Sequence, residues 1–140
     1  MISRSGLYAI RAMAALARLP EGEYGATRDI ARQADVPYSY LGKLLQTLAQ
    51  AGLVRSQKGI GGGFCLARNA KRITLLDVLE PIDAISGQGD CLLGHTICND
   101  KAPCALHDEW KRIRQASLRM LRRSTVADLA ERNELVYRLP

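Results

Sequence analysis

Residues 27–52 decide the fold and read TRDIARQADVPYSYLGKLLQTLAQAG. Thr27 is a good N-cap for a helix, and Ile30 and Ala31 fall on its buried side. Small Ala34 then precedes a tight Asp35-Val36-Pro37 connection. A first short helix that ends in a tight turn is therefore expected.

A second helix is predicted from about Tyr38 to Ala51. Gly52 follows where a left-handed C-cap belongs. Its core stripe is apolar and consists of Leu41, Leu44, Leu45 and Leu48. Two short helices around a tight turn are typical of a helix-turn-helix, whose second helix enters the DNA major groove by its N-terminal end.

The flanking segments extend this unit. Alanine and leucine dominate Gly6–Leu19, which predicts a helix that Pro20 ends. Two strands are expected over Leu53–Lys58 and Phe64–Arg68, joined by a glycine-rich hairpin tip at residues 59–63. A helix-turn-helix followed by such a hairpin is a winged helix. Its wing would be lined by Arg55, Lys58 and Arg68, where phosphate or minor-groove contacts are expected.

A nucleotide-binding loop is the alternative reading of the glycine-rich tip. It is disfavoured because no helix follows the tip and no Gly-Lys-Ser/Thr ending is present.

The charge is concentrated in the first half of the chain. Residues 1–72 carry eleven Lys/Arg against four Asp/Glu, whereas residues 73–140 carry nine against ten. This imbalance indicates a polyanionic partner for the first half, with solvated surface charge as the alternative.

The hydropathy pattern indicates the compartment. No long apolar run or signal peptide pattern is present, so a cytoplasmic, reducing location with no membrane contact is expected. In that setting clustered cysteines are metal ligands or redox sensors rather than structural disulfides.

The second half begins with a helix that Thr74 and Asp77 open as a capping box and that Pro81 should end or bend. A long helix is predicted from about Ala105 to Arg123. Its coiled-coil seam consists of Leu106, Trp110, Ile113, Ser117 and Met120. We interpret the seam as a homodimer interface; the alternative is packing on the chain's own N-terminal domain.

The predicted organisation is mainly α. A winged helix-turn-helix domain spans residues 1–80 and a cysteine-bearing loop spans 81–104. The dimerisation helix and tail span 105–140, with a last short helix near Thr125–Ala130 and a loose tail from Asn133.

Three cysteines are spaced widely within the loop. Cys91, Cys98 and Cys104 are separated by six and five residues, so they match neither C-x-x-C zinc knuckles nor ferredoxin runs. His107 lies three residues after Cys104, so both face one side of a helical turn. Thiolates and an imidazole suit an iron–sulphur cluster or zinc.

Other assignments of these side chains stay open. His95 competes for the fourth ligand position, and the three cysteines could be unliganded. Cys65 alternates with Phe64 and Leu66 on a strand and is interpreted as a small buried hydrophobe.

Together these features resemble the Rrf-type bacterial winged-helix transcription regulators, with IscR-like and NsrR-like iron–sulphur branches. The motifs that carry the resemblance are GLYAIRAM, SYLGKLL, GLVRSQKGIGGGF and CALHDEW, spread over nearly the whole chain. The resemblance implies a homodimer that binds palindromic double-stranded DNA, with a cluster beside the dimerisation helix. In the IscR-like branch a 2Fe–2S cluster has three Cys ligands and one His, which match Cys91, Cys98, Cys104 and His107; a 4Fe–4S cluster stays possible.

Three positions refine the comparison with the family. The NsrR-like branch uses an acidic ligand where this chain has Leu7, which favours His107. The gap after Cys91 is one residue longer than usual, and the base-reading Glu of the IscR-like branch is replaced by Gly42. The operator is therefore expected to differ. The candidate DNA contacts are Arg28, Ser39, Tyr40, Lys43, Arg55, Lys58 and Gly61.

The predicted function is a DNA-binding regulator, a repressor rather than an enzyme, controlled by a cluster that senses iron, redox state or nitric oxide. One alternative is a cluster-free thiol regulator in which Cys91 forms a reversible disulfide with Cys98 or Cys104. Another is a small zinc or iron–sulphur protein that does not act on DNA. No paired carboxylates or nucleophile–base constellation surrounds the cysteines, which disfavours an enzyme.

Overall fold

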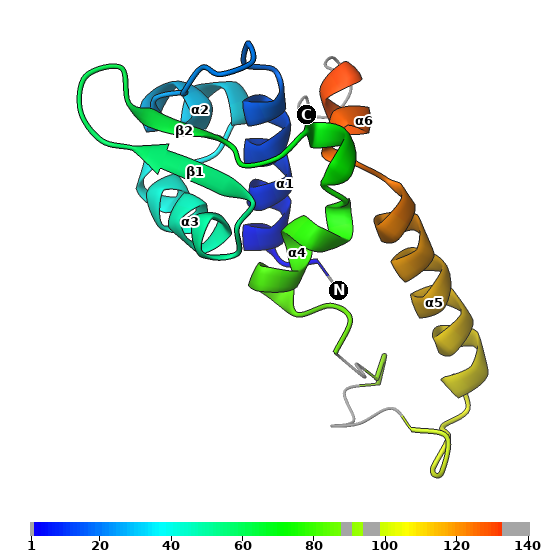
Figure 1. Cartoon of the computed structure of the whole chain (residues 1–140). Helices are drawn as coiled ribbons and strands as arrows, with labels where there is room; N and C mark the ends of the chain where they lie inside the picture. Colours follow the sequence, from blue (N-terminus) through cyan, green and yellow to red (C-terminus); the bar gives the residue numbers. More distant parts are fainter. Residues whose placement is uncertain (1, 88–90, 94–98, 133–140) are drawn as a thin grey trace.

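The computed structural model describes residues 2–87, 91–93 and 99–132. Cys98, His95 and the tail from Asn133 lie outside these residues. The described part is mainly helical, as predicted, with one two-stranded sheet (Figure 1). Its elements are α1 (Arg4–Ala17), α2 (Thr27–Ala34), α3 (Tyr38–Gln50), β1 (Val54–Gln57), β2 (Gly63–Leu66), a 3-10 helix (Ala70–Arg72), α4 (Leu75–Asp83), α5 (His107–Arg123) and α6 (Val126–Glu131).

Helix α1 lies at the centre of the fold and packs against α2, α3, α4 and α6. It begins at Arg4, two residues before the predicted start, because the Ser3 side chain caps it by accepting a hydrogen bond from the Gly6 N–H at 3.0 Å. Small residues such as Ala9 and Ala12 are fully buried and let the neighbouring helices approach closely.

Helices α2 and α3 form the predicted helix-turn-helix. The α3 stripe Leu41, Leu44, Leu45 and Leu48 is buried against α1, and Gly52 takes the expected left-handed conformation with φ of 77°. The N-cap prediction for α2 is wrong. Ala26 has the extended N-cap conformation and Thr27 is already helical, so no side chain caps this helix.

The wing is an antiparallel hairpin in which Val54 pairs with Leu66 and Gln57 with Gly63. Its base is tied to the α1–α2 loop, because Gly25 and Phe64 exchange backbone hydrogen bonds of 2.8 and 2.9 Å. This close approach requires glycine at position 63. Its φ is 141°, and a Cβ there would lie 2.0 Å from the Gly25 carbonyl oxygen.

Helix α4 begins with the predicted Thr74–Asp77 capping box. Pro81 does not end it, since the helix continues to Asp83 before Ala84 turns left-handed with φ of 47°. Proline removes only one backbone hydrogen bond so close to the C-terminal end, and the last turn tolerates the loss.

The C-terminal helices return to this core. α5 packs against α4 through a small cluster of Leu75, Leu79, Ile85 and Leu121. α6 then packs on α1, and Val126 is fully buried in the main core. Within the described ranges, no helix combines the length and apolar character needed to cross a membrane.

Candidate DNA-binding surface and cysteine site

The solvent-exposed stripe of α3 is polar. It consists of Ser39, Lys43, Gln46 and Gln50, which follow steps of four, three and four on the side opposite the leucines. Ser39 and Lys43 are among the predicted DNA contacts, whereas the two glutamines are not. The same spacing rule would have found them, because each lies one turn beyond the previous residue.

Packing and one buried cation hold α3 in place. The Arg11 side chain, 7% exposed, donates from Nη1 to the Asp35 carbonyl oxygen at 3.4 Å. Asp35 has a φ of 52°, so this contact fixes the sharp turn between the two helices. Tyr40 packs edge-on against Tyr8, with ring centroids 5.7 Å apart. The start of α3 therefore has one well-defined orientation toward a ligand.

Arg28 and Tyr38 extend the exposed surface at the N-terminal end of α3. The Arg28 guanidinium lies over the Tyr38 ring, 5.5 Å from its centroid, and both residues are exposed. Such a stacked cation keeps its hydrogen-bond donors free for phosphate oxygens.

A groove of about 480 Å³ separates α3 from the wing. It is lined by polar side chains, among them Thr27, Gln46, Gln50, Ser56 and Lys58. When a recognition helix enters the major groove and a wing enters the adjacent minor groove, the phosphate strand between the grooves passes over such a cleft.

The arginines of the hairpin lie apart from this groove. Arg55 lines a second cavity of about 400 Å³, together with Cys65 and the α1–α2 loop. Arg68 does not extend along the wing as expected, because its Nη2 lies 3.7 Å from the Asp77 carboxylate of α4. Cys65 is buried, as predicted, and its hydrogen bond with Tyr24 raises the pKa of that phenol.

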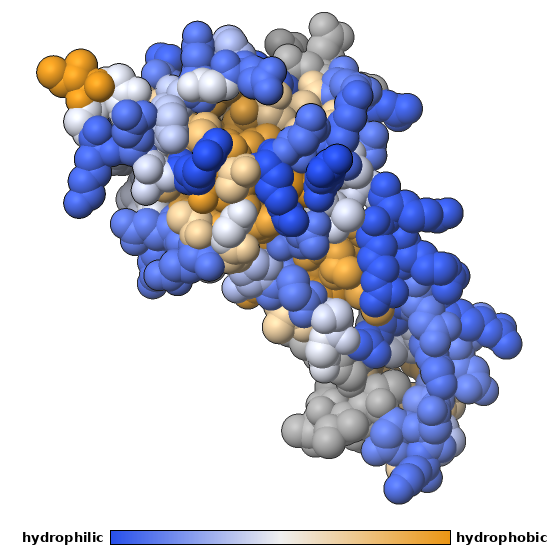
Figure 2. Space-filling model, in the orientation of Figure 1, coloured by the Kyte–Doolittle hydropathy of each residue, from blue (hydrophilic) through white to orange (hydrophobic). Residues whose placement is uncertain are grey.

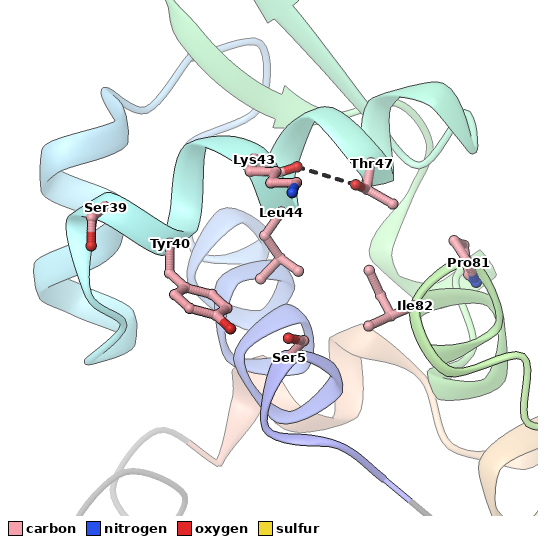
Figure 3. A pocket seen from close by; sticks show the side chains of 8 residues that line it. All are labelled: Ser5, Ser39, Tyr40, Lys43, Leu44, Thr47, Pro81 and Ile82. Atoms are coloured by element: carbon pink, nitrogen blue, oxygen red, sulfur yellow. Dashed lines mark hydrogen bonds between the residues drawn. The ribbon is translucent and has the colours of Figure 1, made fainter.

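A cavity of about 460 Å³ lies on the other side of α3, toward α1 and α4 (Figure 3). Tyr40 and Lys43 of α3 line it, as do Pro81 and Ile82 of α4. Thr47 donates its hydroxyl to the Lys43 carbonyl oxygen at 3.2 Å. Helices α3 and α4 thus form two walls of one cavity, which lies beside Tyr40 and Lys43, two candidates for DNA contact.

The cysteine site adjoins the first turn of α5. His107 is the first residue of that helix and is 5% exposed. Its backbone N–H donates a hydrogen bond to the Cys104 carbonyl oxygen at 3.1 Å. Cys91 and Cys104 are both half-buried. In the described ranges no three His, Cys, Asp or Glu side chains converge on one point where a metal ion could bind. Cys104 and buried His107 lie three residues apart at the start of α5, and a thiol and an imidazole are ligand types that suit a soft metal centre.

Asp100, which is not among the predicted site residues, contacts both His107 and Lys111. Its Oδ1 lies 2.8 Å from His107 Nε2 and 2.8 Å from Lys111 Nζ. The hydrogen bond from Lys111 and then that from His107 hold the pKa of this carboxyl below its usual value. Asp100 lies in the loop before α5, so helical periodicity does not mark its contacts with His107 and Lys111.

Helix α5 presents three different faces. One packs on α4 through Leu118 and Leu121. A second is apolar and exposed, with Leu106, Ile113 and Met120 at steps of seven residues and 41%, 55% and 51% exposed. The third is basic, and Figure 2 shows hydrophilic side chains along α5 on the face in view; its exposed cations are Lys111, Arg112, Arg119, Arg122 and Arg123.

The outward apolar face retains three of the five predicted seam positions. Trp110 and Ser117 are half-buried instead. A dimer interface along the five seam positions stays a prediction.

Comparisons with known proteins place this arrangement among DNA-binding regulators. Residues 2–132 match the model of the Rrf2 family, described as iron-dependent transcriptional regulators. A helix-turn-helix type transcriptional regulator of Mycobacterium tuberculosis is 35% identical over 130 residues, which is 92% of this chain and 80% of the relative. Another from Aquifex aeolicus is 32% identical over 124 residues, 87% of this chain and 85% of the relative.

Solved structures give the same fold. CymR, the global cysteine regulator of B. subtilis, is similar with a TM-score of 0.81 and 28% identity, covering 96% of this chain and 98% of that one. IscR of T. potens has a TM-score of 0.75 at 24% identity, covering 100% of this chain and 93% of that one, which supports the fold alone.

Proposed function

This chain belongs to the Rrf2 family of DNA-binding transcriptional regulators, and we propose that it is a cytoplasmic repressor whose operator binding depends on an iron–sulphur cluster. The observation that carries the proposal is the position of half-buried Cys104 and buried His107 at the start of α5, where a backbone hydrogen bond of 3.1 Å joins the two residues. α5 is anchored to α4, and α4 shares a cavity with the recognition helix. The cysteine site is thus connected to the DNA-binding surface along the length of α5 and then through α4.

In the proposed complex α3 lies in the major groove. Ser39, Lys43 and Gln46 face base edges there, and a glutamine amide suits adenine. Lys58 and Gly61 of the wing lie at the adjacent minor groove, and Arg28 and Tyr40 flank the helix start. Arg55 contributes to the positive field rather than to the groove between α3 and the wing.

A homodimer through the exposed stripe of α5 accounts for the apolar side chains there. Leu106, Ile113 and Met120 repeat every seven residues, which suits pairing with a second α5. The pairing sets the distance between two winged helices. A palindromic operator with half-sites one helical turn apart requires about 34 Å between them.

The proposed cluster ligands are Cys91, Cys98, Cys104 and His107, with a 2Fe–2S cluster favoured over 4Fe–4S. Such a cluster would supply a centre that changes oxidation state or is lost when the iron supply, the redox state or the nitric oxide concentration changes. Cys104 and His107 would fix the start of α5 when ligated and release it when not. The population of dimers that fit the operator would shift accordingly.

Anaerobic purification tests the cluster. The wild-type protein should be coloured, with iron and sulphide in equal amounts, and Cys98→Ala should lose the colour. Operator binding in a gel shift should weaken steeply with salt and change when the cluster is removed. A colourless anaerobic protein that holds stoichiometric zinc would contradict the proposal.

A thiol regulator is the second candidate, favoured by the similarity to CymR, a global cysteine regulator. In that case Cys91 would form a reversible disulfide with Cys98 or Cys104. Iron-free, reduced protein would then bind the operator fully and lose binding on peroxide treatment, with recovery after a thiol reductant. Mass spectrometry of the peroxide-treated protein would identify the linked cysteines.

A further inference from the structure

The cavity of about 460 Å³ between α1, α3 and α4 has the size and the chemistry of a small-molecule site. Small-molecule pockets span about 300–1,000 Å³ and combine apolar walls with a few polar groups. Apolar side chains of α3 and α4 form one part of the wall here, among them Leu44, Pro81 and Ile82 (Figure 3). Its polar part consists of four hydroxyls and one ammonium group, from Ser5, Ser39, Tyr40, Lys43 and Thr47.

The polar groups of this wall are available to a ligand. Thr47 donates its hydroxyl to the Lys43 carbonyl oxygen at 3.2 Å, so its oxygen can still accept hydrogen bonds. Within the described ranges, the Lys43 ammonium group and the Ser5 and Ser39 hydroxyls have neither a hydrogen-bond partner nor an ion-pair partner. No acidic side chain of the described residues lines the cavity, and Asp83 of α4 accepts a hydrogen bond from the N-cap residue of α1 instead. The cavity therefore has one positive charge and no negative charge among these residues.

Lys43 belongs both to this cavity and to the polar stripe of α3 that faces DNA in the proposed complex. On the cavity side, Tyr40, Lys43 and Thr47 are spaced by three and four residues, so they share one side of the helix. On the exposed stripe, Lys43 lies between Ser39 and Gln46 at steps of four and three. The two sides meet at Lys43, so a ligand that engages its ammonium group takes a cation away from DNA.

We propose that this cavity binds a small organic acid, with its carboxylate at Lys43 and its apolar body against Pro81 and Ile82, and that the bound acid weakens DNA binding. The competition rests on the proposed function, in which α3 contacts DNA, whereas the binding of the acid does not. Lys43 and the neighbouring hydroxyls supply the donors that a carboxylate needs. Exposed Pro81 and half-buried Ile82 lose contact with water against an aliphatic or aromatic body.

Two fluorescent probes that differ by one anionic group test the site. The anionic probe is anilinonaphthalene sulfonate, whose sulfonate stands in for the carboxylate, and the neutral probe is phenylnaphthylamine, which has the same rings. The anionic probe should bind wild type. Lys43→Gln should weaken its binding by about 3–10-fold, as expected for the loss of one hydrogen bond to a charged group at a partly exposed site, and leave the neutral probe unaffected. Thr47→Phe places a ring in the cavity and should weaken the binding of both probes.

Two variants outside the cavity are matched controls. Lys58→Gln removes an exposed cation that lines the groove beside the wing, and Ile113→Ala removes an exposed apolar side chain of α5. Both should bind the anionic probe as wild type does. The proposal is overturned if the anionic probe does not bind, if Lys43→Gln and Lys58→Gln weaken it equally, or if Ile113→Ala abolishes its binding. Lys43 is exposed, so its variant decides the question even where Thr47→Phe does not fold.

A competition experiment separates this inference from the proposed function. Fluorescence anisotropy of a labelled random-sequence duplex at low salt measures DNA binding. The anionic probe should raise the wild-type protein concentration that half-saturates the duplex, and it should have no such effect on Thr47→Phe. If Lys43→Gln binds the duplex with wild-type affinity and salt dependence, the proposed contact of α3 with DNA fails at this residue, and the probe titrations still decide whether the cavity binds an anion. If Lys43→Gln weakens DNA binding but the bound probe does not, the competition is refuted and the DNA contact stands.

Discussion

Replacement of Leu121 by alanine tests whether one face of α5 holds that helix to the body. Leu121 is 2% exposed and packs against Leu75, Leu79 and Ile85. Buried Leu→Ala changes cost about 2–5 kcal/mol, and this small peripheral cluster can partly collapse, so we expect about 2–3 kcal/mol. For 140 residues the unfolding entropy corresponds to roughly 3 °C per kcal/mol, so the melting temperature should fall by about 7–10 °C.

Ile113→Ala is the matched control for this prediction, because it removes an aliphatic side chain from the exposed face of the same helix. Ile113 is 55% exposed, so its loss should change the intrinsic stability by less than about 0.5 kcal/mol. If that face pairs with a second copy, Ile113→Ala instead lowers stability most at protein concentrations where the wild type is dimeric, and the effect vanishes where both proteins are monomeric. Leu121→Ala should act equally at all concentrations.

Urea unfolding of reduced, metal-free protein, followed by circular dichroism at several concentrations, distinguishes the two faces. Operator affinity gives a second measurement. Leu121→Ala should bring the affinities of cluster-loaded and cluster-free protein closer together while leaving the salt dependence unchanged, since the DNA-facing cations are untouched. The assignment of Leu121 to the packed face and Ile113 to the exposed face would be refuted if both variants lost the same free energy of unfolding. A loss of less than about 1 kcal/mol for Leu121→Ala would refute it too.

Three further predictions concern the wing and the last helix. Gly63→Ala should cost at least about 1–3 kcal/mol in urea unfolding, because its φ is 141° and the added Cβ would strike the Gly25 carbonyl oxygen; a wild-type midpoint would contradict the seating of the wing. Lys58→Gln should lower the slope of log affinity against log salt by about 1 and weaken all DNA sequences alike, as titrations with operator and random DNA would show. Asp128 has a pKa below its ordinary 3.8, owing first to the backbone hydrogen bond from Thr125 and then to the bond with its hydroxyl. The ionised carboxylate therefore stabilises α6 fully above that ordinary value and loses the effect as pH falls through the lowered pKa, so stability of wild type and Asp128→Asn should converge in acid, and a constant gap would argue against the cap.

Features set by local sequence were predictable. The leucine stripe of α3 follows from helical periodicity, and the Thr74–Asp77 box needs only residues three apart. The same holds for Gly52, whose left-handed conformation follows from its place after a helix.

Features set by the meeting of distant segments were not predictable. The contact of Asp100 with His107 depends on how a loop turns, and loop conformation leaves no period in the sequence. The pairing of Arg68 with Asp77 depends on where the hairpin lies relative to α4. The seven-residue repeat predicts that Leu106, Ile113 and Met120 share one face of α5, but it does not show which face α4 covers.

The junction between α4 and α6 has a consequence for how such proteins diversify. Leu75 N–H donates to the Ser124 carbonyl oxygen and Val126 N–H to that of Ile73, both at 2.9 Å, so the chain leaves and re-enters the core at one point. Between these two bonds α4 still packs on α1 and α5 packs on α4, so the segment whose length can change is the one between α4 and α5. Insertions or deletions within it leave the register of the core unchanged, as they do in surface loops with neighbouring ends. A change in the spacing between Cys91 and Cys98 is therefore one that this architecture can absorb without altering the winged helix.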